Sequence, residues 1–272
     1  MRKNKSILLS APYILWMLLF TLIPLGVIGY YALTDANGAF SLDNLKELGM
    51  YTGVLWQSVW YSLISAFICL LLGYPVAYFI AHRTPVVQKF LYMLVMLPMC
   101  MSFLLRTMAW VGLLQDTGII NNFLGQFGIG PLPLIRTPAA VILGMVYNYL
   151  PYMILPLYAI IVKIDKRLIE AAEDLGCNGI QVFSRVVFPL SMPGILSGMT
   201  MVFVPAVSTF YISQKLGGTD TVLIGDVIER QFKQADNPNL GAALSLVLML
   251  LVFVCTGIMN RFGGDDDGGV VV

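Results

Sequence analysis

A charged stretch between residues 170 and 190 is the most distinctive polar feature of this chain. It reads EAAEDLGCNGIQVFSRVVFPL and lies between two long apolar runs, although 58% of all residues are hydrophobic and only 11% are charged. Just before and within its first half, an apolar stripe repeats at helical spacing and consists of Leu168, Ile169, Ala172 and Leu175. The opposite side of the same helical pattern is acidic and carries Glu170, Glu173 and Asp174.

The second half of this stretch repeats the helical pattern after a break. Gly176 lies where a left-handed cap would end the first helix. The next helical pattern has an apolar face that consists of Ile180, Phe183, Val186 and Val187. Pro189 disfavours helix at Phe188 and turns the chain toward the next apolar run. The pattern therefore predicts a short helix–turn–helix, either a knob that docks in a groove of a partner protein or a solvated connecting loop.

Residues suited to catalysis or metal binding are scarce elsewhere. His82 is the only histidine, and the four cysteines include no CxxC pair, so we expect no metal site and no catalytic residue. The chain has no HExxH sequence and no paired carboxylates within an apolar run, which argues against an intramembrane enzyme. It also lacks G-x-x-x-x-G-K-[ST], so any ATP is expected to bind to another protein.

Composition places the chain among membrane proteins. Its mean hydropathy is +0.81 and its formal net charge is +1, which excludes the basic surface of a nucleic-acid-binding protein. Six apolar runs approach or exceed the length of about 20 residues that one helix needs to cross a bilayer. We expect an all-α polytopic membrane protein with one domain over residues 1–261 and a low-complexity tail over 262–272. The expected spans are about 8–33, 57–82, 90–114, 138–162, 192–214 and 240–260.

Lysine and arginine residues indicate the orientation. With the N-terminus in the cytoplasm, the inner segments carry ten of these residues and the outer loops carry five. We therefore expect both termini and the 163–191 loop on the cytoplasmic side. The uncharged run from Ser6 to Thr34 is followed by no small-residue cleavage site, so we expect a retained membrane helix rather than a signal peptide.

The spacing within the charged stretch resembles the EAA motif of ABC-importer permeases, E-A-A-x3-G-x9-I-x-L-P. Here Glu170-Ala171-Ala172 is followed at the motif's spacing by Gly176 and by Val186-x-Phe188-Pro189, so two apolar positions differ from the motif. In that family the loop forms coupling helices that seat in a cleft of a separate ATP-binding subunit. The resemblance implies that Glu170 meets a basic residue of the ATPase and that small residues permit close approach. The implied coupling residues are Glu170, Ala171, Ala172, Asp174, Gly176 and Pro189.

Further segments from about Leu9 to Arg261 are similar to the permease subunits of spermidine/putrescine importers, above all to the one usually called the B subunit. These segments include LGYPVAYFIA, LLRTMAWVGLL, GMVYNYLPYMILPLY and FPLSMPGILSG. The resemblance implies a type I ABC-importer permease fold and transport of polyamines. It also implies three partners, namely a homodimeric ATPase that binds ATP and Mg, a second homologous permease and an extracytoplasmic polyamine-binding protein.

A polyamine is a flexible polycation with methylene stretches, so its path should offer aromatic faces and hydroxyl groups. Such residues gather in the fourth and fifth runs, where Tyr149 and Tyr152 are three apart and can share one helix face. They are either path residues or packing and interfacial residues, and the candidates are Tyr147, Asn148, Tyr149, Tyr152, Ser208, Phe210 and Tyr211.

Charged residues near the outer surface are candidates for a gate or an acidic entrance. Arg106 is the one charge inside an apolar run and lies 17 residues after Lys89, which corresponds to about 25 Å of straight helix. It is expected near the outer surface, where it either extends to the headgroups or pairs with a carboxylate such as Asp116. Residues 222–232 suggest a lid with a break at Gly225. The outer carboxylates are Asp116, Asp220, Asp226 and Glu229.

Two alternatives stay open beside a polyamine permease. The first is the permease of an ABC importer for another small solute, because related permeases carry diverse substrates. The second is a channel or a structural membrane protein, which has no need of a docking loop for an ATPase.

Overall fold

The computed structural model describes residues 12–35, 38–219, 221–235 and 237–262. Within these ranges the regular structure is helical, apart from one isolated bridge between Thr34 and Phe40. The first helix, Pro12–Ala32, contains a π-helical turn η1 (Leu18–Leu22) followed by α2 (Ile23–Ala32). The later elements are α3 (Asp43–Glu47), η2 (Leu48–Tyr51), α4 (Thr52–Ala81), α5 (Pro85–Met96), η3 (Leu97–Cys100), α6 (Phe103–Leu114), α7 (Ile119–Gly125), α8 (Pro138–Ile161), α9 (Lys166–Asp174), α10 (Gly179–Val182), η4 (Phe183–Val187), α11 (Phe188–Leu190), α12 (Met192–Val207), α13 (Tyr211–Leu216), α14 (Ile224–Lys233) and α15 (Pro238–Phe262).

Among the described residues, four helices are long and apolar enough to cross a membrane as single elements. They are Pro12–Ala32, Leu48–Ala81, Pro138–Ile161 and Pro238–Met259. Two bent pairs bring the number to six when each pair counts as one span. Pro85–Cys100 and Phe103–Gly125 meet at 86°, and Gly179–Leu190 and Met192–Val207 meet at 63°. The predicted number of spans therefore agrees with the structure only if both bent pairs cross the membrane.

Residues 90–114 do not form one straight helix. The 3₁₀ turn η3 begins at Leu97 and carries Pro98 in its first positions, and Met101 and Ser102 then have extended ψ angles near 146° and 130°, which ends α5–η3 before α6 begins. The 25 Å rise expected between Lys89 and Arg106 assumed continuous helix, so it does not hold across this break. Similarly, the predicted run 192–214 ends as a helix at Val207, and α13 starts as a separate element at Tyr211.

Helices α4, α8 and α12 form the packed centre of the bundle. Small residues permit close helix contacts, as is usual where helices pack inside a membrane. A Cβ at Gly198 of α12 would lie 2.7 Å from the sulfur of Met153 in α8, and one at Gly73 of α4 would lie 3.2 Å from Cγ of the same Met153. Pro75, Pro151, Pro156 and Pro205 all lie inside these helices.

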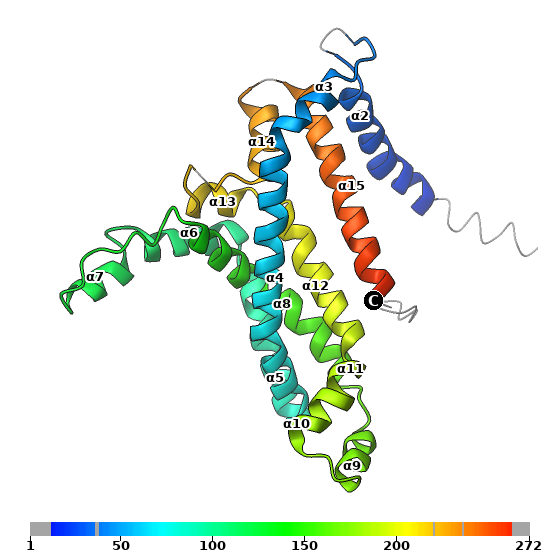
Figure 1. Ribbon diagram of the computed structural model, residues 1–272, viewed down its shortest axis with the longest axis vertical. Coiled ribbons are helices and arrows are strands. Elements are labelled where there is room, and N and C mark those ends of the chain that lie inside the picture. Colours follow the sequence, from blue (N-terminus) through cyan, green and yellow to red (C-terminus); the bar gives the residue numbers. More distant parts are fainter. Residues whose placement is uncertain (1–11, 36–37, 220, 236, 263–272) are drawn as a thin grey trace, which may run out of the picture.

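Figure 1 shows that the elements gather at two opposite ends of this bundle and in one lateral arm. Helices α9 to α11 form the lower end, α3 and α14 lie at the upper end, and α6 and α7 project to one side. Helix α2 lies against α15 on the other side of the bundle. The charged loop and α14 are therefore separated by the length of the bundle.

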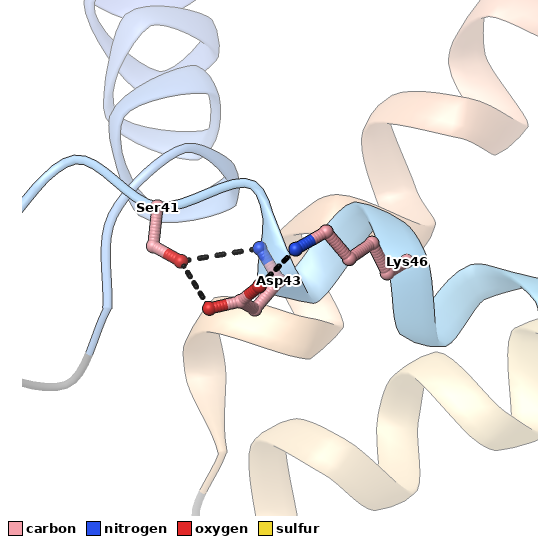
Figure 2. Close-up of polar contacts among 3 residues, drawn as sticks. All are labelled: Ser41, Asp43 and Lys46. Atoms are coloured by element: carbon pink, nitrogen blue, oxygen red, sulfur yellow. Dashed lines mark hydrogen bonds and ion pairs between the residues drawn. The ribbon is translucent and has the colours of Figure 1, made fainter.

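A local polar network begins α3 at the upper end, as Figure 2 shows. Lys46 donates to Oδ1 of Asp43 at 2.7 Å, while Ser41 donates to Oδ2 at 2.9 Å and accepts from the Asp43 backbone N–H at 3.1 Å. These bonds, first of all the one from Lys46, hold the pKa of the exposed Asp43 carboxyl below its ordinary value. Asp43 is therefore a carboxylate at the upper end of the bundle that already has a basic partner.

Candidate functional site

The 163–191 loop forms the helix–turn–helix that the sequence predicts. The Asp165 carboxylate caps α9 by accepting from the Arg167 backbone N–H at 3.0 Å. Gly176 has a φ of +85°, which confirms the predicted left-handed end of this helix. Asn178 and Gln181 then form a reciprocal capping box with two bonds of 2.9 Å, which starts α10. Short local bonds therefore define the shape of the loop.

Most of the EAA-type residues face outward. Glu170, Ala171, Asp174, Gly176 and Pro189 are exposed, whereas Ala172 is buried. A Cβ at Gly176 would meet nothing within 4 Å, so the backbone conformation rather than a crowded contact within the chain requires glycine there. A bulky residue at Gly176 would consequently strain the turn as well as alter a docking surface.

The predicted apolar face of α9 is only half correct. Ile169 and Ala172 pack inward, but Leu168 and Leu175 are 49% and 86% exposed. Ile180, expected on the inner face of the second helix, is 80% exposed. We refer to Leu175 and Ile180, the two most exposed apolar residues of the loop, as its apolar tip; helical spacing did not predict their exposure, because the helix ends at the left-handed Gly176 between them.

The expectation that Pro189 disfavours helix at Phe188 is wrong. Phe188 has φ and ψ of −62° and −49°, and helical structure continues through α11. A π-helical turn, η4, ends at Val187, two residues before Pro189, and widens the backbone where the proline ring would otherwise crowd a carbonyl. The chain bends instead at Ser191, between α11 and α12.

Aromatic residues attach the loop to the bundle. The ring of Phe183 contacts Tyr74 and Tyr78 of α4 at centroid distances of 5.4 Å and 5.9 Å, both edge-to-face. The Tyr74 hydroxyl lies 2.8 Å from Oγ of Ser191 at the start of α12. The loop is therefore bonded to α4 at the same point where the chain enters α12.

A cavity of about 440 Å³ opens at the other end of α12. Three segments line it: α6, the middle of α8, and the irregular residues that connect α12 to α13. Its lining consists of Phe103, Leu104, Arg106, Asn148, Tyr149, Tyr152, Ser208, Thr209, Phe210 and Tyr211. Six of the seven predicted path residues therefore share one cavity.

The cavity wall combines aromatic faces with polar groups. Tyr149 and Tyr152 lie edge-to-face at 6.3 Å, as their spacing of three predicts, and Phe103 faces Tyr211 at 6.1 Å. The Tyr149 hydroxyl donates to the Pro205 carbonyl at 3.3 Å, which joins α8 to α12 beside the cavity. This arrangement offers ring faces to a cation and hydroxyl or amide groups to a hydrogen-bond donor.

Tyr147 and Arg106 lie elsewhere than the sequence suggests. Tyr147 is absent from the cavity lining and packs edge-to-face on Trp110 at 5.4 Å. Arg106 is only 6% exposed and lines the cavity, so it does not extend to an outer headgroup layer. Asp116 is exposed, and neither ion pair found within the described residues joins it to Arg106.

Two of the remaining predicted carboxylates, Asp226 and Glu229, lie in α14. Asp226 and Glu229 line a second, polar cavity of about 530 Å³, whereas Asp220 lies outside the described residues. Asp226 is buried, which raises the pKa of its carboxyl, while Oδ2 accepts from the Leu223 backbone N–H at 2.8 Å. Glu229 accepts from Lys233 at 2.7 Å and from Gln214, which lowers its pKa.

Helix α14 is seated directly on the first cavity's wall. Gly225 lies in the first turn of α14 rather than at a break, which corrects the expected lid geometry. A Cβ there would lie 2.6 Å from the Thr209 carbonyl and 2.8 Å from that of Ser208. The Ile224 backbone N–H donates to Oγ of the buried Ser58 at 2.8 Å, which anchors the start of α14 to α4.

Comparisons with known proteins agree with this architecture. Residues 70–263 match the family model described as "Binding-protein-dependent transport system inner membrane component". The spermidine/putrescine transport system permease protein PotB of Haemophilus influenzae is 41% identical over 90% of this chain and 92% of its own length. PotB of Escherichia coli is 39% identical over 87% of this chain and 90% of its own length. An inner membrane ABC transporter permease of Escherichia coli, YdcU, is 32% identical over 72% and 67%.

Solved structures with the same fold have low sequence identity. A chain from a bacterial ABC transporter that imports the acidic polysaccharide alginate superposes with a TM-score of 0.76 at 19% identity, over 97% of this chain and 98% of its own. A chain of the methionine ABC transporter MetNI gives a TM-score of 0.59 at 15% identity, over 80% and 96%. The fold is that of an ABC-importer permease, and the chain belongs to the family of binding-protein-dependent transport system inner membrane components, as a multi-pass protein of the bacterial inner membrane.

Proposed function

We propose that this chain is one of two homologous permease subunits of an ATP-driven importer for polyamines, spermidine or putrescine. The observation that carries the proposal is its identity of 41% and 39%, over nearly the whole of each chain, with two permeases of spermidine/putrescine transport systems. The protein itself supplies half of the transport path and no ATP-binding site. A homodimeric ATPase binds ATP and Mg, and a polyamine-binding protein delivers the substrate from outside the cell.

The 163–191 loop is the docking element for the ATPase in this proposal. It lies at one end of the bundle, and it presents Glu170 and Asp174 beside the apolar tip of Leu175 and Ile180 (Figure 1). A carboxylate next to exposed apolar side chains suits a cleft that has one basic residue and an apolar floor. This role places the loop and both termini in the cytoplasm, in agreement with the lysine and arginine distribution.

Movement of the docked loop would reach the first cavity through α12. The loop enters α12 at Ser191, and α12 ends at Val207, next to the cavity residues Ser208 and Thr209. Because Gly198 is packed against Met153 of α8, α12 moves with α8 rather than sliding freely along it. Closure of the ATPase would thereby change the shape of the cavity wall.

The first cavity suits a substrate with ammonium groups and methylene stretches. The faces of Tyr149, Tyr152 and Phe210 attract ammonium groups, and the aromatic rings cover methylene groups from water. The outer end, with α14 and its polar cavity of about 530 Å³, is the docking surface for the polyamine-binding protein.

Uptake by the complete complex in proteoliposomes tests this function. We expect ATP-dependent accumulation of labelled putrescine or spermidine, and competition by the other polyamine but not by amino acids, sugars or oxyanions. Accumulation of a non-polyamine solute alone would replace the proposed substrate but keep the permease role. Solute flux that needs no ATPase would favour a channel.

A matched pair of variants tests the cavity. The double variant Tyr149→Ala, Tyr152→Ala removes two ring faces from the cavity, whereas Tyr147→Ala removes a tyrosine of the same helix that lies outside it. We expect the double variant to lose uptake about tenfold or more, since each cation–π contact contributes about 0.5–2 kcal/mol. Tyr147→Ala should retain most of the uptake. Equal uptake by the two variants would contradict the role of this cavity.

A further inference from the structure

Arg106 is a buried cation without a counter-ion in the described part of the chain. Its side chain is 6% exposed, and both Nε and Nη1 are buried without a hydrogen-bond partner. None of the ten cavity-lining residues is a carboxylate, and the two ion pairs found within the described residues involve Lys46 and Lys233. Arginine stays protonated at any physiological pH, so this charge cannot be avoided by losing a proton.

An unpaired guanidinium in such a position is energetically costly. Removing one partner of a buried ion pair is strongly destabilising, because the other charge is left uncompensated. Because α6 begins after the break at Ser102, Arg106 is buried in the bundle. Its side chain therefore does not extend to the lipid headgroups. An anionic group supplied by the assembled transporter at this cavity would compensate the charge.

The cavity also lacks a donor for a second buried group. Asn148 donates to the Gly144 carbonyl at 2.9 Å, but its Oδ1 is buried without a partner. The lining of one cavity thus contains both an acceptor, Oδ1 of Asn148, and cationic donors on Arg106 that have no hydrogen-bond partner within the described residues. Its rim is open and apolar, with Leu104 49% and Phe210 41% exposed, as expected for a surface that another protein covers.

We propose that an Asp or Glu side chain of the second permease subunit pairs with Arg106 across the transport path. This inference rests on the proposed function, because it requires a second permease. The ion pair closes the empty path between the two subunits. An ammonium group of the substrate competes with Arg106 for the carboxylate and donates to Oδ1 of Asn148, so that a polycation opens a gate that a neutral solute cannot.

The competition explains why a cation path would contain an arginine. A carboxylate alone would hold a polyamine strongly, whereas a carboxylate that returns to Arg106 releases the substrate once it moves on. Charge-assisted hydrogen bonds from guanidinium and from ammonium to a carboxylate are similar in strength. The free energy of moving the carboxylate from Arg106 to a substrate ammonium group is therefore close to zero. Arg106 is thus a positioning and gating residue rather than a direct ligand of the substrate.

Cross-linking of the purified complex tests the pairing without any transport. Arg106→Cys is combined, one at a time, with Asp→Cys or Glu→Cys changes in the membrane part of the second subunit, in a background with Cys100→Ala to remove the exposed free thiol. A short bifunctional thiol reagent is needed, since a disulfide requires Cα atoms about 4.4–6.8 Å apart and an ion pair of long side chains spans more. Leu105→Cys, 66% exposed and outside the cavity lining, is the control.

We expect one carboxylate position to cross-link with Arg106→Cys and not with Leu105→Cys, and polyamine to reduce the yield. Charge reversal then tests the interaction itself. Arg106→Glu should lower uptake at least about tenfold, the effect of losing about 1.4 kcal/mol. The opposite change to Arg at the cross-linked position should restore most of it.

Three results would overturn the pairing. These are the absence of any cross-linking carboxylate, cross-linking without rescue by charge reversal, and rescue by an uncharged residue; the first would leave Arg106 to a lipid phosphate or to water. Failure of the proposed function looks different. A complex that cross-links but imports no polyamine would refute the proposed substrate and would still support the pairing of Arg106. A chain that assembles without a second permease would refute both the proposed function and the pairing.

Discussion

The 163–191 loop and the Arg106 cavity differ in how their shapes are specified. The loop is built from one continuous segment, and neighbouring residues such as Asp165, Asn178 and Gln181 cap its helices through local bonds. The cavity is assembled from α6, α8 and the α12–α13 connection, which are far apart in the sequence. A local structure can expose its functional side chains without affecting the bundle, whereas a change in the cavity also disturbs the packing that forms it.

The largest effect should come from reversing a charge on the loop. We expect Glu170→Lys to lower ATP-driven uptake by more than about tenfold, because a basic partner residue would then face a like charge, which costs several kcal/mol. Glu170 is exposed, so the melting temperature of the isolated permease should stay unchanged. Uptake and complex yield are the measurements, with Glu173→Lys, an exposed acid outside the motif positions, as the control. Equal effects of the two changes would point to general charge rather than to a specific contact.

The apolar tip of the loop should contribute less than Glu170. Replacing Leu175 and Ile180 by serine removes two large exposed side chains that touch little of the rest of the chain. If the ATPase covers each side chain only in part, the two together are worth about 1.5–3 kcal/mol, so we expect at least about a tenfold loss in affinity for the ATPase. Titration of the permease with the purified ATPase measures this. Unaltered affinity would show that the tip stays in solvent.

Two glycine changes compare a crowded position beside the cavity with an open position in α6. Gly225→Ala places a methyl group against two fixed carbonyl oxygens, so we expect a loss of about 1–3 kcal/mol in stability together with reduced uptake. Gly112→Ala in α6 meets nothing within 4 Å and should be neutral or stabilising by up to about 1 kcal/mol. Thermal unfolding of the detergent-solubilised protein compares them. A stable Gly225→Ala protein with normal uptake would mean that α14 can move away from Thr209.

The smallest expected effect is a pH dependence at Asp226. Burial raises the pKa of its carboxyl above the unfolded value, so the folded state favours the neutral acid. This contribution is complete below the unfolded pKa and is lost as the pH rises through the folded pKa. Asp226→Asn keeps an acceptor for the Leu223 N–H and should therefore melt higher than the natural protein near pH 7, with a smaller difference near pH 4. A lower melting temperature at pH 7 would indicate that the carboxylate is paired in the folded protein.

Local features were predictable to the extent that local chemistry controls them. The number of apolar runs, the end of α9 at Gly176 and the contact of Tyr149 with Tyr152 follow from composition, backbone preference and helical spacing. The helical conformation of Phe188 was not predictable, because the π turn that accommodates Pro189 is an alternative that a rule for ordinary α-helices omits. Leu175 and Ile180 were misplaced because the chain direction after a turn is not encoded in helical spacing.

The sequence by itself determined that this chain is an all-helical membrane protein with a charged helix–turn–helix loop, and that it contains aromatic and hydroxyl residues of the types that a cation path would need. Hydrophobicity and spacing suffice for these conclusions because each depends on neighbours within a few turns of one helix. Only the tertiary structure decided that Tyr147 leaves the cavity and that Arg106 enters it. Both outcomes depend on the sharp bend between η3 and α6 and on how α8 and α12 pack, which are interactions between segments distant in sequence.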